Sequence, residues 1–264
     1  MPTLSRPTRR RVIGAALAGF AAAAGGPVFA DPLIDRLGGG GSASVTDTAD
    51  RRSAPARRRW SLEHIGTSVE GRPIEMHTNV DPAMRASVLA ISTVHGDERG
   101  VGPIGEELTT VTVPPGVSAY VVPIANPDGW ARGTRNNARD VDLNRNFPWW
   151  WSHRDGGPGR ASEPETQALM ALVARLRPVV TVWIHQPYEY VSAVDPRAER
   201  WARAWADAAG LPLLPAITQH GGGETWTYHE LGLASILVEG TTREASIGET
   251  SAHRRGFEAL LAAL

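Results

Sequence analysis

The sequence changes from apolar to polar within residues 87–98, which read Ser87-Val88-Leu89-Ala90-Ile91-Ser92-Thr93-Val94-His95-Gly96-Asp97-Glu98. The first eight residues form a short apolar run rich in β-branched side chains, and such a run predicts a buried strand. The polar residues that follow therefore lie where this strand ends. Functional side chains commonly sit beyond the carboxyl ends of strands in an open α/β sheet, so this junction is a candidate site.

Further apolar runs alternate with helical patterns on both sides of this stretch. We predict strands at 74–79, 87–94, 117–125, 179–184 and 234–238. The expected helices are 100–110, 163–176, 196–209, 225–231 and 247–264, and Ser162-Glu163-Pro164-Glu165 is a capping box that marks the start of the second of these. This alternation predicts an α/β fold with a doubly wound mixed sheet flanked by helices.

His95 and Glu98 have the spacing of two ligands that turn toward one metal ion. The chain has eight His, so such a pair can also arise by chance. His185 follows the predicted strand 179–184 and supplies a third ligand, although a lone His at a strand end is also common as a structural residue. Two His and one carboxylate leave the fourth position of zinc open, which is typical of a catalytic site. We therefore expect one Zn²⁺ ion here.

Glu239 stands at the same edge of the sheet, because it follows the last predicted strand. A Glu in this place is either a solvated strand terminus or a general base. As a base it would take a proton from the attacking water and pass it to the leaving amine. The convergence of several strand ends on one chemistry favours the base.

The segment 126–148 is rich in hydrogen-bond donors and reads Asn-Pro-Asp-Gly-Trp-Ala-Arg-Gly-Thr-Arg-Asn-Asn-Ala-Arg-Asp-Val-Asp-Leu-Asn-Arg-Asn-Phe-Pro. The donors that would bind an anionic substrate group or a developing oxyanion are Arg132, Arg135, Asn144 and Arg145. We call these donors the clamp. A metal ion beside the clamp indicates an enzyme that removes a terminal residue.

Taken together, these motifs resemble the zinc metallocarboxypeptidases of the M14 or funnelin family. The shared elements are His-x-x-Glu, Asn-Pro-Asp-Gly, Asp-Leu-Asn-Arg-Asn-Phe, Ile-His and a Glu on a final strand. The resemblance covers residues 60–264, and the phrasing of segment 126–148 looks most like the bacterial branch that includes murein peptide amidases.

The resemblance implies a role for each site residue. Zinc would bind His95, Glu98 and His185, and Glu239 would be the catalytic base. Arg132 would polarise the scissile carbonyl, with Arg135 as the rival for this role because only spacing separates them. Asn144 and Arg145 would hold the terminal carboxylate of the substrate.

The chain departs from the digestive members of the family around the substrate pocket. Those enzymes carry a substrate-contacting Tyr shortly before a Gly-Gly-Ser turn, whereas residues 216–223 contain no Tyr, so either His220 replaces it or the role is absent. Counting back from Trp226 places Glu224 at the position that lines the specificity pocket. An acid there favours a side chain bearing an ammonium or guanidinium group. The alternative is that Glu224 only caps the helix expected at 225–231.

Three consecutive Trp residues, Trp149-Trp150-Trp151, follow the clamp in a stretch that reads as loop. They either wall the substrate cleft or pack against the core.

The amino terminus has the pattern of a targeting signal rather than of a folded segment. Residues 1–30 resemble a twin-arginine signal peptide, with Arg9-Arg10-Arg11 before an Ala/Gly-rich apolar run, and an uncleaved anchor is the alternative. Residues 31–59 are rich in Gly, Ser, Asp and Arg and predict a disordered linker. Residues 60–264 are then the catalytic domain, and we expect the protein to be exported to the periplasm, cell wall or medium.

Composition limits the partners. The chain has no Cys, so no disulfide stabilises it, and its net charge of -1 gives no basic face for nucleic acid. We expect a monomer that acts on a peptide or muropeptide substrate, without stable membrane insertion once the signal is removed.

The function expected is hydrolysis of the peptide bond next to a free C-terminal residue, in particular in peptidoglycan-derived peptides. One alternative is a zinc deacylase of N-acyl amino acids, which export disfavours because such substrates are mostly cytosolic. The other is a non-catalytic peptide-binding module, which the full set of ligands, base and clamp disfavours.

Overall fold

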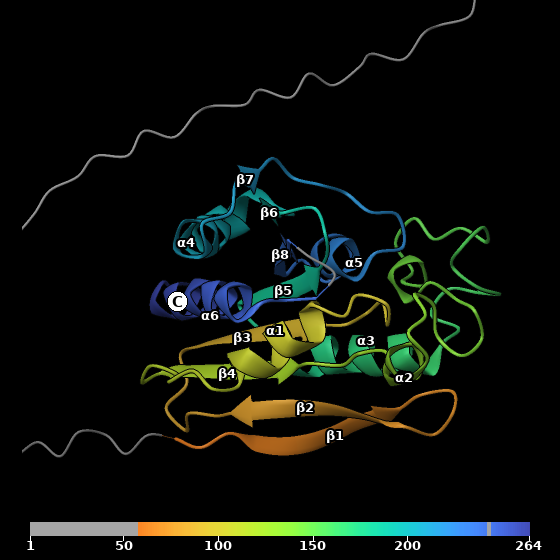
Figure 1. Ribbon diagram of the computed structural model, residues 1–264, viewed down its shortest axis with the longest axis horizontal. Coiled ribbons are helices and arrows are strands. Elements are labelled where there is room, and N and C mark those ends of the chain that lie inside the picture. The colour runs from red at the N-terminus through yellow and green to blue at the C-terminus, as the bar shows by residue number, and fades with distance from the viewer. Residues whose placement is uncertain (1–57, 242–243) are drawn as a thin grey trace, which may run out of the picture. The chain divides into compact units, whose positions relative to one another are not determined.

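The structure is a computed structural model that describes residues 58–241 and 244–264, so the predicted signal peptide and nearly all of the predicted linker lie outside the described residues (Figure 1). Within these ranges one sheet has the strand order β1-β2-β4-β3-β5-β8-β6-β7. Its strands are β1 Ser61–Thr67, β2 Pro73–Asn79, β3 Ala86–Ser92, β4 Val117–Val122, β5 Val180–His185, β6 Tyr190–Ala193, β7 Leu213–Leu214 and β8 Ala234–Glu239.

The centre of the sheet is parallel and its outer parts are mixed. Strands β4, β3, β5 and β8 are neighbours and all run in the same direction. Strands β1 and β2 extend one side as antiparallel neighbours, and β6 pairs antiparallel with β8 on the other. The carboxyl ends of β3, β5 and β8 therefore meet at one edge, which is where the sequence places the candidate ligands and base.

Helices connect these strands. They are α1 Val101–Leu108, α2 Pro127–Arg132, α3 Pro164–Leu176, α4 Glu199–Ala209, α5 Gly223–His229 and α6 Ile247–Ala262, with short 3₁₀ turns η1 Leu143–Arg145 and η2 Pro196–Ala198. No helix in the described ranges has both the length and the apolar character that crossing a bilayer requires. The predicted α/β class and the doubly wound mixed sheet are confirmed.

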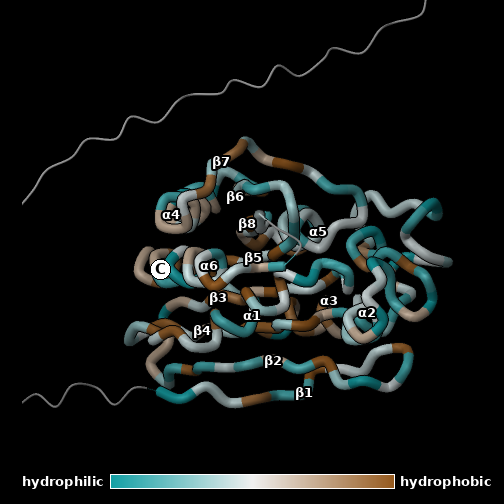
Figure 2. The backbone as a smooth tube through the Cα atoms, viewed as in Figure 1, coloured by the Kyte–Doolittle hydropathy of each residue, from teal (hydrophilic) through white to brown (hydrophobic). Residues whose placement is uncertain are grey.

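The central strands are buried on both faces. Val88 and Ala90 of β3 pack into one apolar cluster with residues of α1, α4 and α6. Leu89 and Ile91 point the other way, into a second cluster with residues of α3 and α5. Because both faces are covered, these strands read as continuous apolar runs rather than as alternating ones. Figure 2 shows this as brown stretches in the central strands, with teal loops around them.

Some local predictions were wrong. Strands β1, β6 and β7 and helix α2 were not predicted, because they are short or lie in polar sequence. The capping box does not form: Glu163, not Ser162, is the N-cap of α3, and it makes no side-chain cap bond. The Ser162 hydroxyl instead donates to Glu163 Oε1 at 2.7 Å and accepts from Asn146 Nδ2 at 3.0 Å.

Arg58 shows that the ordered domain extends into the predicted linker. Its guanidinium donates to the carbonyl oxygens of Val113, Pro114 and Val117 at 2.9 to 3.3 Å. It also forms an ion pair of 3.2 Å with Asp81. Arg58 is therefore part of the fold rather than of a disordered linker.

The contact between α4 and α6 contains a buried ionisable group, the imidazole of His253. His253 of α6 is 1% exposed and accepts a hydrogen bond of 3.4 Å at Nδ1 from the indole N–H of Trp205 in α4. Burial lowers the pKa of His253 to about 4, and the charge of Glu249 offsets this only in part. The folded protein therefore keeps this imidazole neutral at pH values where an unfolded His is protonated.

The His253 site should make stability depend on pH. Above the unfolded pKa of 6.5 both states are neutral, and as pH falls from there toward about 4 only the unfolded state gains the proton, so stability is lost in this window. Between pH 7.5 and 5 we expect a loss of about 2 kcal/mol in the free energy of unfolding from this group. His253→Gln, whose amide oxygen can accept from Trp205, should remove this part of the loss in urea titrations. Equal losses in both proteins would contradict the assignment.

Candidate active site

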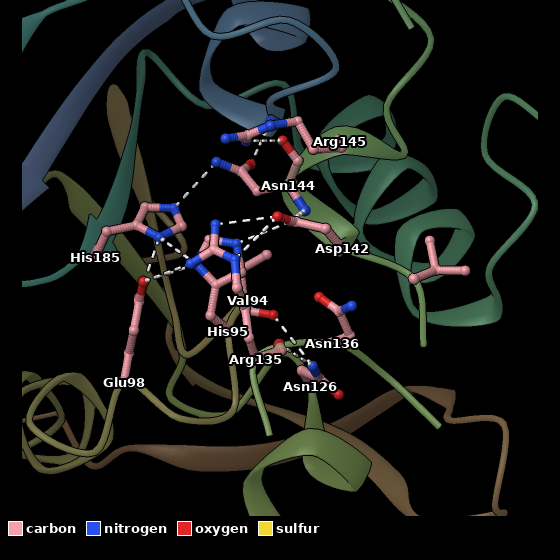
Figure 3. A network of polar contacts seen from close by, with 12 residues as sticks. Val94, His95, Glu98, Asn126, Arg135, Asn136, Asp142, Asn144, Arg145 and His185 are labelled. Atoms are coloured by element: carbon pink, nitrogen blue, oxygen red, sulfur yellow. Dashed lines mark hydrogen bonds and ion pairs between the residues drawn. The ribbon is translucent and has the colours of Figure 1, made fainter. Parts of the chain in front are cut away.

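Three predicted ligands meet at the carboxyl edge of the sheet. His95, Glu98 and His185 are buried and offer atoms that all lie within 4.8 Å of one another (Figure 3). His95 Nδ1 is 2.7 Å from Glu98 Oε1, and His185 Nδ1 is 3.2 Å from both His95 Nδ1 and Glu98 Oε2. In a tetrahedral zinc site with ligands about 2.0 Å from the metal, ligand atoms are roughly 3.3 Å apart. The donor set and its spacing therefore fit zinc.

The backbone around His95 is held by the Asn-Pro-Asp-Gly turn. A side chain at Gly96 would lie 1.9 Å from the backbone of Gly129, so only glycine fits between the His and the Glu of the motif. The Asn126 side chain donates to the carbonyl oxygens of Val94 and Arg135, at 3.3 and 3.4 Å, and accepts from Gly129 N at 2.9 Å. Asn126 thus caps α2 and joins the exit of β3 to the loop that carries Arg135.

Asp142 is a site residue that the sequence analysis missed. Its Oδ1 lies 3.0 Å from His95 Nε2, on the opposite side of the ring from the predicted metal position. A carboxylate in this place fixes the tautomer of a ligating His and raises the basicity of its other nitrogen. Burial alone would raise the pKa of Asp142, but the hydrogen bond and charge of His95 hold it well below its usual range. The available signal was its position just before Leu-Asn-Arg in the clamp segment.

The electrostatics at the ligands favour a cation. Burial raises the pKa of Glu98, but His185 and His95 outweigh this and lower it to about 2. Burial lowers the pKa of His185, and the charges of Glu98, Glu239 and Glu224 reverse this and raise it to about 9. These carboxylates thus stabilise positive charge at the point where the three ligands meet.

Glu239 lies beside the ligands because of strand register. It is the last residue of β8 and pairs directly with His185, the last residue of β5. Burial raises the pKa of Glu239 and the charge of Glu98 adds to this, while His185 opposes it, and the resulting value is about 7. A carboxylate with a pKa near neutral can both accept and return a proton, as the predicted general base must.

Arg135, not Arg132, reaches the cleft. Arg135 lines the cavity that also contains the three ligands and Glu239, and it contacts Asp142 Oδ2 through Nε at 3.1 Å and NH2 at 3.0 Å. Arg132 ends helix α2 and forms an ion pair with Glu70 in the turn between β1 and β2, outside this cavity. Arg132, which was predicted to polarise the carbonyl, therefore lies outside the cavity, and its rival Arg135 lies in it, because the chain turns at Gly133 and brings Arg135 to the cleft.

Asn144 and Arg145, the predicted carboxylate-binding residues, both line the cavity. Asn144 Oδ1 accepts from the backbone N–H of Gly223 at 2.9 Å, while its Nδ2 lies 3.5 Å from His185 Nε2. Arg145 donates from NH1 to the Asn144 carbonyl at 2.8 Å (Figure 3). Their placement next to the ligands leaves donors that can meet a substrate carboxylate.

Glu224 lines the same cavity and is 1% exposed. The N-cap of α5 is Gly222, so the interpretation of Glu224 as the cap is wrong, although it does lie in the first turn. Tyr190 also lines the cavity, paired in register with Glu239, and was not predicted. Burial and the charges of Glu239 and Glu224 raise the pKa of Tyr190, so its phenol stays protonated. His220 does not line this cavity and contacts Trp150 instead.

Comparison with known proteins supports the reading of this site. A family model described as zinc carboxypeptidase matches residues 115–194, which include the clamp segment and His185. Murein peptide amidase A of Escherichia coli K12 is 37% identical over 174 residues, which cover 59% of this chain and 70% of the relative. The corresponding protein of Vibrio campbellii is 32% identical over 195 residues, which cover 66% and 77% of the two chains. The chain belongs to the M14 family of zinc carboxypeptidases. It is therefore a metallopeptidase.

Solved M14 structures share its fold. The crystal structure of murein-tripeptide amidase MpaA from E. coli O157 has a TM-score of 0.61 and 28% identity, and the match covers 77% of this chain and 91% of that one. Carboxypeptidase A from Helicoverpa armigera has a TM-score of 0.63 over 78% of this chain and 69% of its own, and at 19% identity this likeness shows the fold alone.

Asp142 should control metal affinity without being a ligand. Asp142→Asn keeps the side-chain shape but weakens the charge-assisted contact to His95, and we expect zinc affinity to fall by about 10- to 100-fold. Asp140→Asn, two residues away and exposed, is the matched control and should bind zinc like the parent. Competition with a chromophoric chelator measures both. Equal affinity of all three proteins would remove Asp142 from the metal site.

Two arginines of equal exposure test the carbonyl-binding role. The side chains of Arg132 and Arg135 are both 44% exposed, and only Arg135 lines the cavity. Arg135→Ala should lower kcat/KM for peptide hydrolysis by about 100-fold or more, because an oxyanion donor is lost. Arg132→Ala should stay within about threefold of the parent. The reverse ranking, with both variants folded by circular dichroism, would restore the first assignment.

Proposed function

We propose that this protein is an exported zinc carboxypeptidase or amidase that hydrolyses the peptide bond before a free C-terminal residue with an amino-bearing side chain, such as diaminopimelate in murein peptides. The observation that carries the proposal is Glu224. Its carboxylate is buried in the wall of the cleft, and its Oε2 has no hydrogen-bond partner in the described part of the chain.

An unpaired buried carboxylate is costly, so a cation is the natural partner for Glu224. No basic side chain of the described residues forms an ion pair with Glu224, whose Oε1 accepts a hydrogen bond from the Thr225 hydroxyl at 3.4 Å and whose Oε2 has no partner. A substrate ammonium that enters the pocket beside Asn144 and Arg145 would supply this charge. Such a substrate would present its terminal carboxylate to the clamp and its amino group to Glu224.

Each residue then has one task in the reaction. Zinc, when bound by His95, Glu98 and His185, supplies Lewis-acid chemistry that activates water and polarises the carbonyl. Glu239 holds the proton of the attacking water and transfers it to the nitrogen of the leaving residue. Arg135 donates to the carbonyl oxygen as negative charge develops on it.

The relatives support this substrate class. Two of them are named murein peptide amidases, and murein peptides contain diaminopimelate with one amino and one carboxylate group on its side chain. Glu224 suits the amino group, and of the arginines that line the cavity Arg135 and Arg145 suit the carboxylates. A twin-arginine signal in residues 1–30 would bring the enzyme to the compartment that holds this polymer.

The alternatives are weaker. The family assignment favours a peptidase over a deacylase of N-acyl amino acids, and the complete ligand set argues against a binding module without activity. A free diaminopimelate tripeptide, an N-acyl amino acid and an amidated tripeptide distinguish them. Zinc-dependent release of diaminopimelate from the free tripeptide alone is the expected result.

Glu224 should set the ranking of substrates. In the parent, kcat/KM for peptides ending in diaminopimelate, Lys or Arg should exceed that for peptides ending in Leu by about 10- to 100-fold. The reason is that charge pairing in a partly desolvated pocket contributes about 1 to 3 kcal/mol. Glu224→Gln should remove most of this ranking and leave zinc content unchanged. Asp97→Asn changes an exposed acid at the same cavity and should keep the ranking. An unchanged ranking in Glu224→Gln would reject the specificity role.

A further inference from the structure

The Trp triplet does not wall the substrate cleft. Trp149 and Trp150 line a separate open hollow, which we call the aromatic platform, together with Pro148, Trp151, Arg160, His220 and Glu230. Trp151 is tied into its own loop, since its indole N–H donates to the Gly156 carbonyl at 2.7 Å. The platform surface is therefore made mainly by Trp149, Trp150 and His220.

The rings of the platform form a stack. Trp149 lies parallel to His229, with ring centroids 4.0 Å apart and planes 2° apart. Trp150 stacks on Trp149 at 4.4 Å, and His220 meets Trp150 edge-on at 4.5 Å. This stacking holds the outer indole in a fixed orientation.

Core packing does not account for Trp150. All nine Trp of the chain lie in the described residues, and Trp150 is the one among them with a largely exposed side chain, at 58%. Its φ of 51° is in the left-handed region, which is unfavourable for a bulky residue. Backbone strain of this kind clusters at functional sites, and burial in the core does not offset it here.

The platform is joined to the substrate cleft by backbone hydrogen bonds. Gly221 N donates to the Trp149 carbonyl at 2.9 Å, and Phe147 N donates to the Gly221 carbonyl at 3.0 Å. In the same segment Gln219 lines the cleft while its neighbour His220 lines the platform. A molecule on the platform would therefore lie directly beside the peptide site.

We propose that the aromatic platform binds a β-linked N-acetylamino-sugar chain, the glycan component of murein. A flat indole face packs against the C–H face of a pyranose ring, and polar groups at its edge bind hydroxyl and acetamido groups. Arg160 lines the platform and supplies donors, and Glu230, whose Oε2 already accepts from the Trp226 indole at 3.2 Å, supplies its other oxygen as an acceptor. The platform would hold the enzyme on its polymer while the cleft takes the peptide. The choice of this glycan rests on the proposed function.

Calorimetry with chitotetraose as the probe tests the proposal on the full-length protein. The parent should bind, Trp150→Ala should bind about tenfold more weakly or not measurably, and Trp150→Tyr should retain part of the affinity because an aromatic face remains. Ile247→Ala is the matched control, because Ile247 is another exposed apolar residue, at 87%, outside the platform. It should bind like the parent. Arg160→Ala gives an independent loss of affinity if Trp150→Ala does not fold.

Turnover of a soluble free tripeptide separates this proposal from the proposed function. Trp150 does not line the cleft, so Trp150→Ala should hydrolyse this substrate within about twofold of the parent. No binding of chitotetraose by the parent, or equal binding by parent and Trp150→Ala, would overturn the glycan site whatever the turnover. Absence of tripeptide hydrolysis in a parent that binds the sugar would instead overturn the proposed function alone.

Discussion

Buried negative charge at the carboxyl edge of the sheet is the constraint on which the rest of this structure depends. Glu98, Asp142, Glu224 and Glu239 are between 1% and 7% exposed and all lie around one cleft. Charges so far removed from water are stable only with partners. Asp142 pairs with Arg135 and His95, and Glu98 contacts both His rings. The remaining charge favours a cation at the point where the three ligands meet.

The parallel core of the sheet brings these groups together. β5 and β8 end in register, so His185 and Glu239 are neighbours by pairing rather than by chance. β3 ends three residues before His95, and the intervening turn is held by Asn126. Helices on both faces keep this edge rigid because the strands between them are buried on both sides.

The sequence was informative where a long apolar run meets a polar motif. The strands that carry His95, His185 and Glu239 could be predicted because burial on both faces leaves an unmistakable apolar run. Arg135 could not be separated from Arg132 by spacing, since the decision depends on a turn at Gly133 with a φ of 70°. Tyr190 was missed because its strand has four residues and its place beside Glu239 is set by pairing with β8. Asp142 acts through a contact with a residue 47 positions away, which no local pattern encodes.

Asn126 joins two segments of the site that are far apart in the sequence. By binding the backbone on both sides, it places His95 and Arg135 in one frame built from the sheet and α2. Glu224 lies in the first turn of α5, which packs on β5 and β8 and is also tied to the clamp segment by the bond from Gly223 N to Asn144. Because Asn126 makes no hydrogen bond with Glu224, the side chain at position 224 can change in evolution while Asn126 keeps His95 and Arg135 in place. Related enzymes can therefore differ in their substrates while their catalytic groups stay the same.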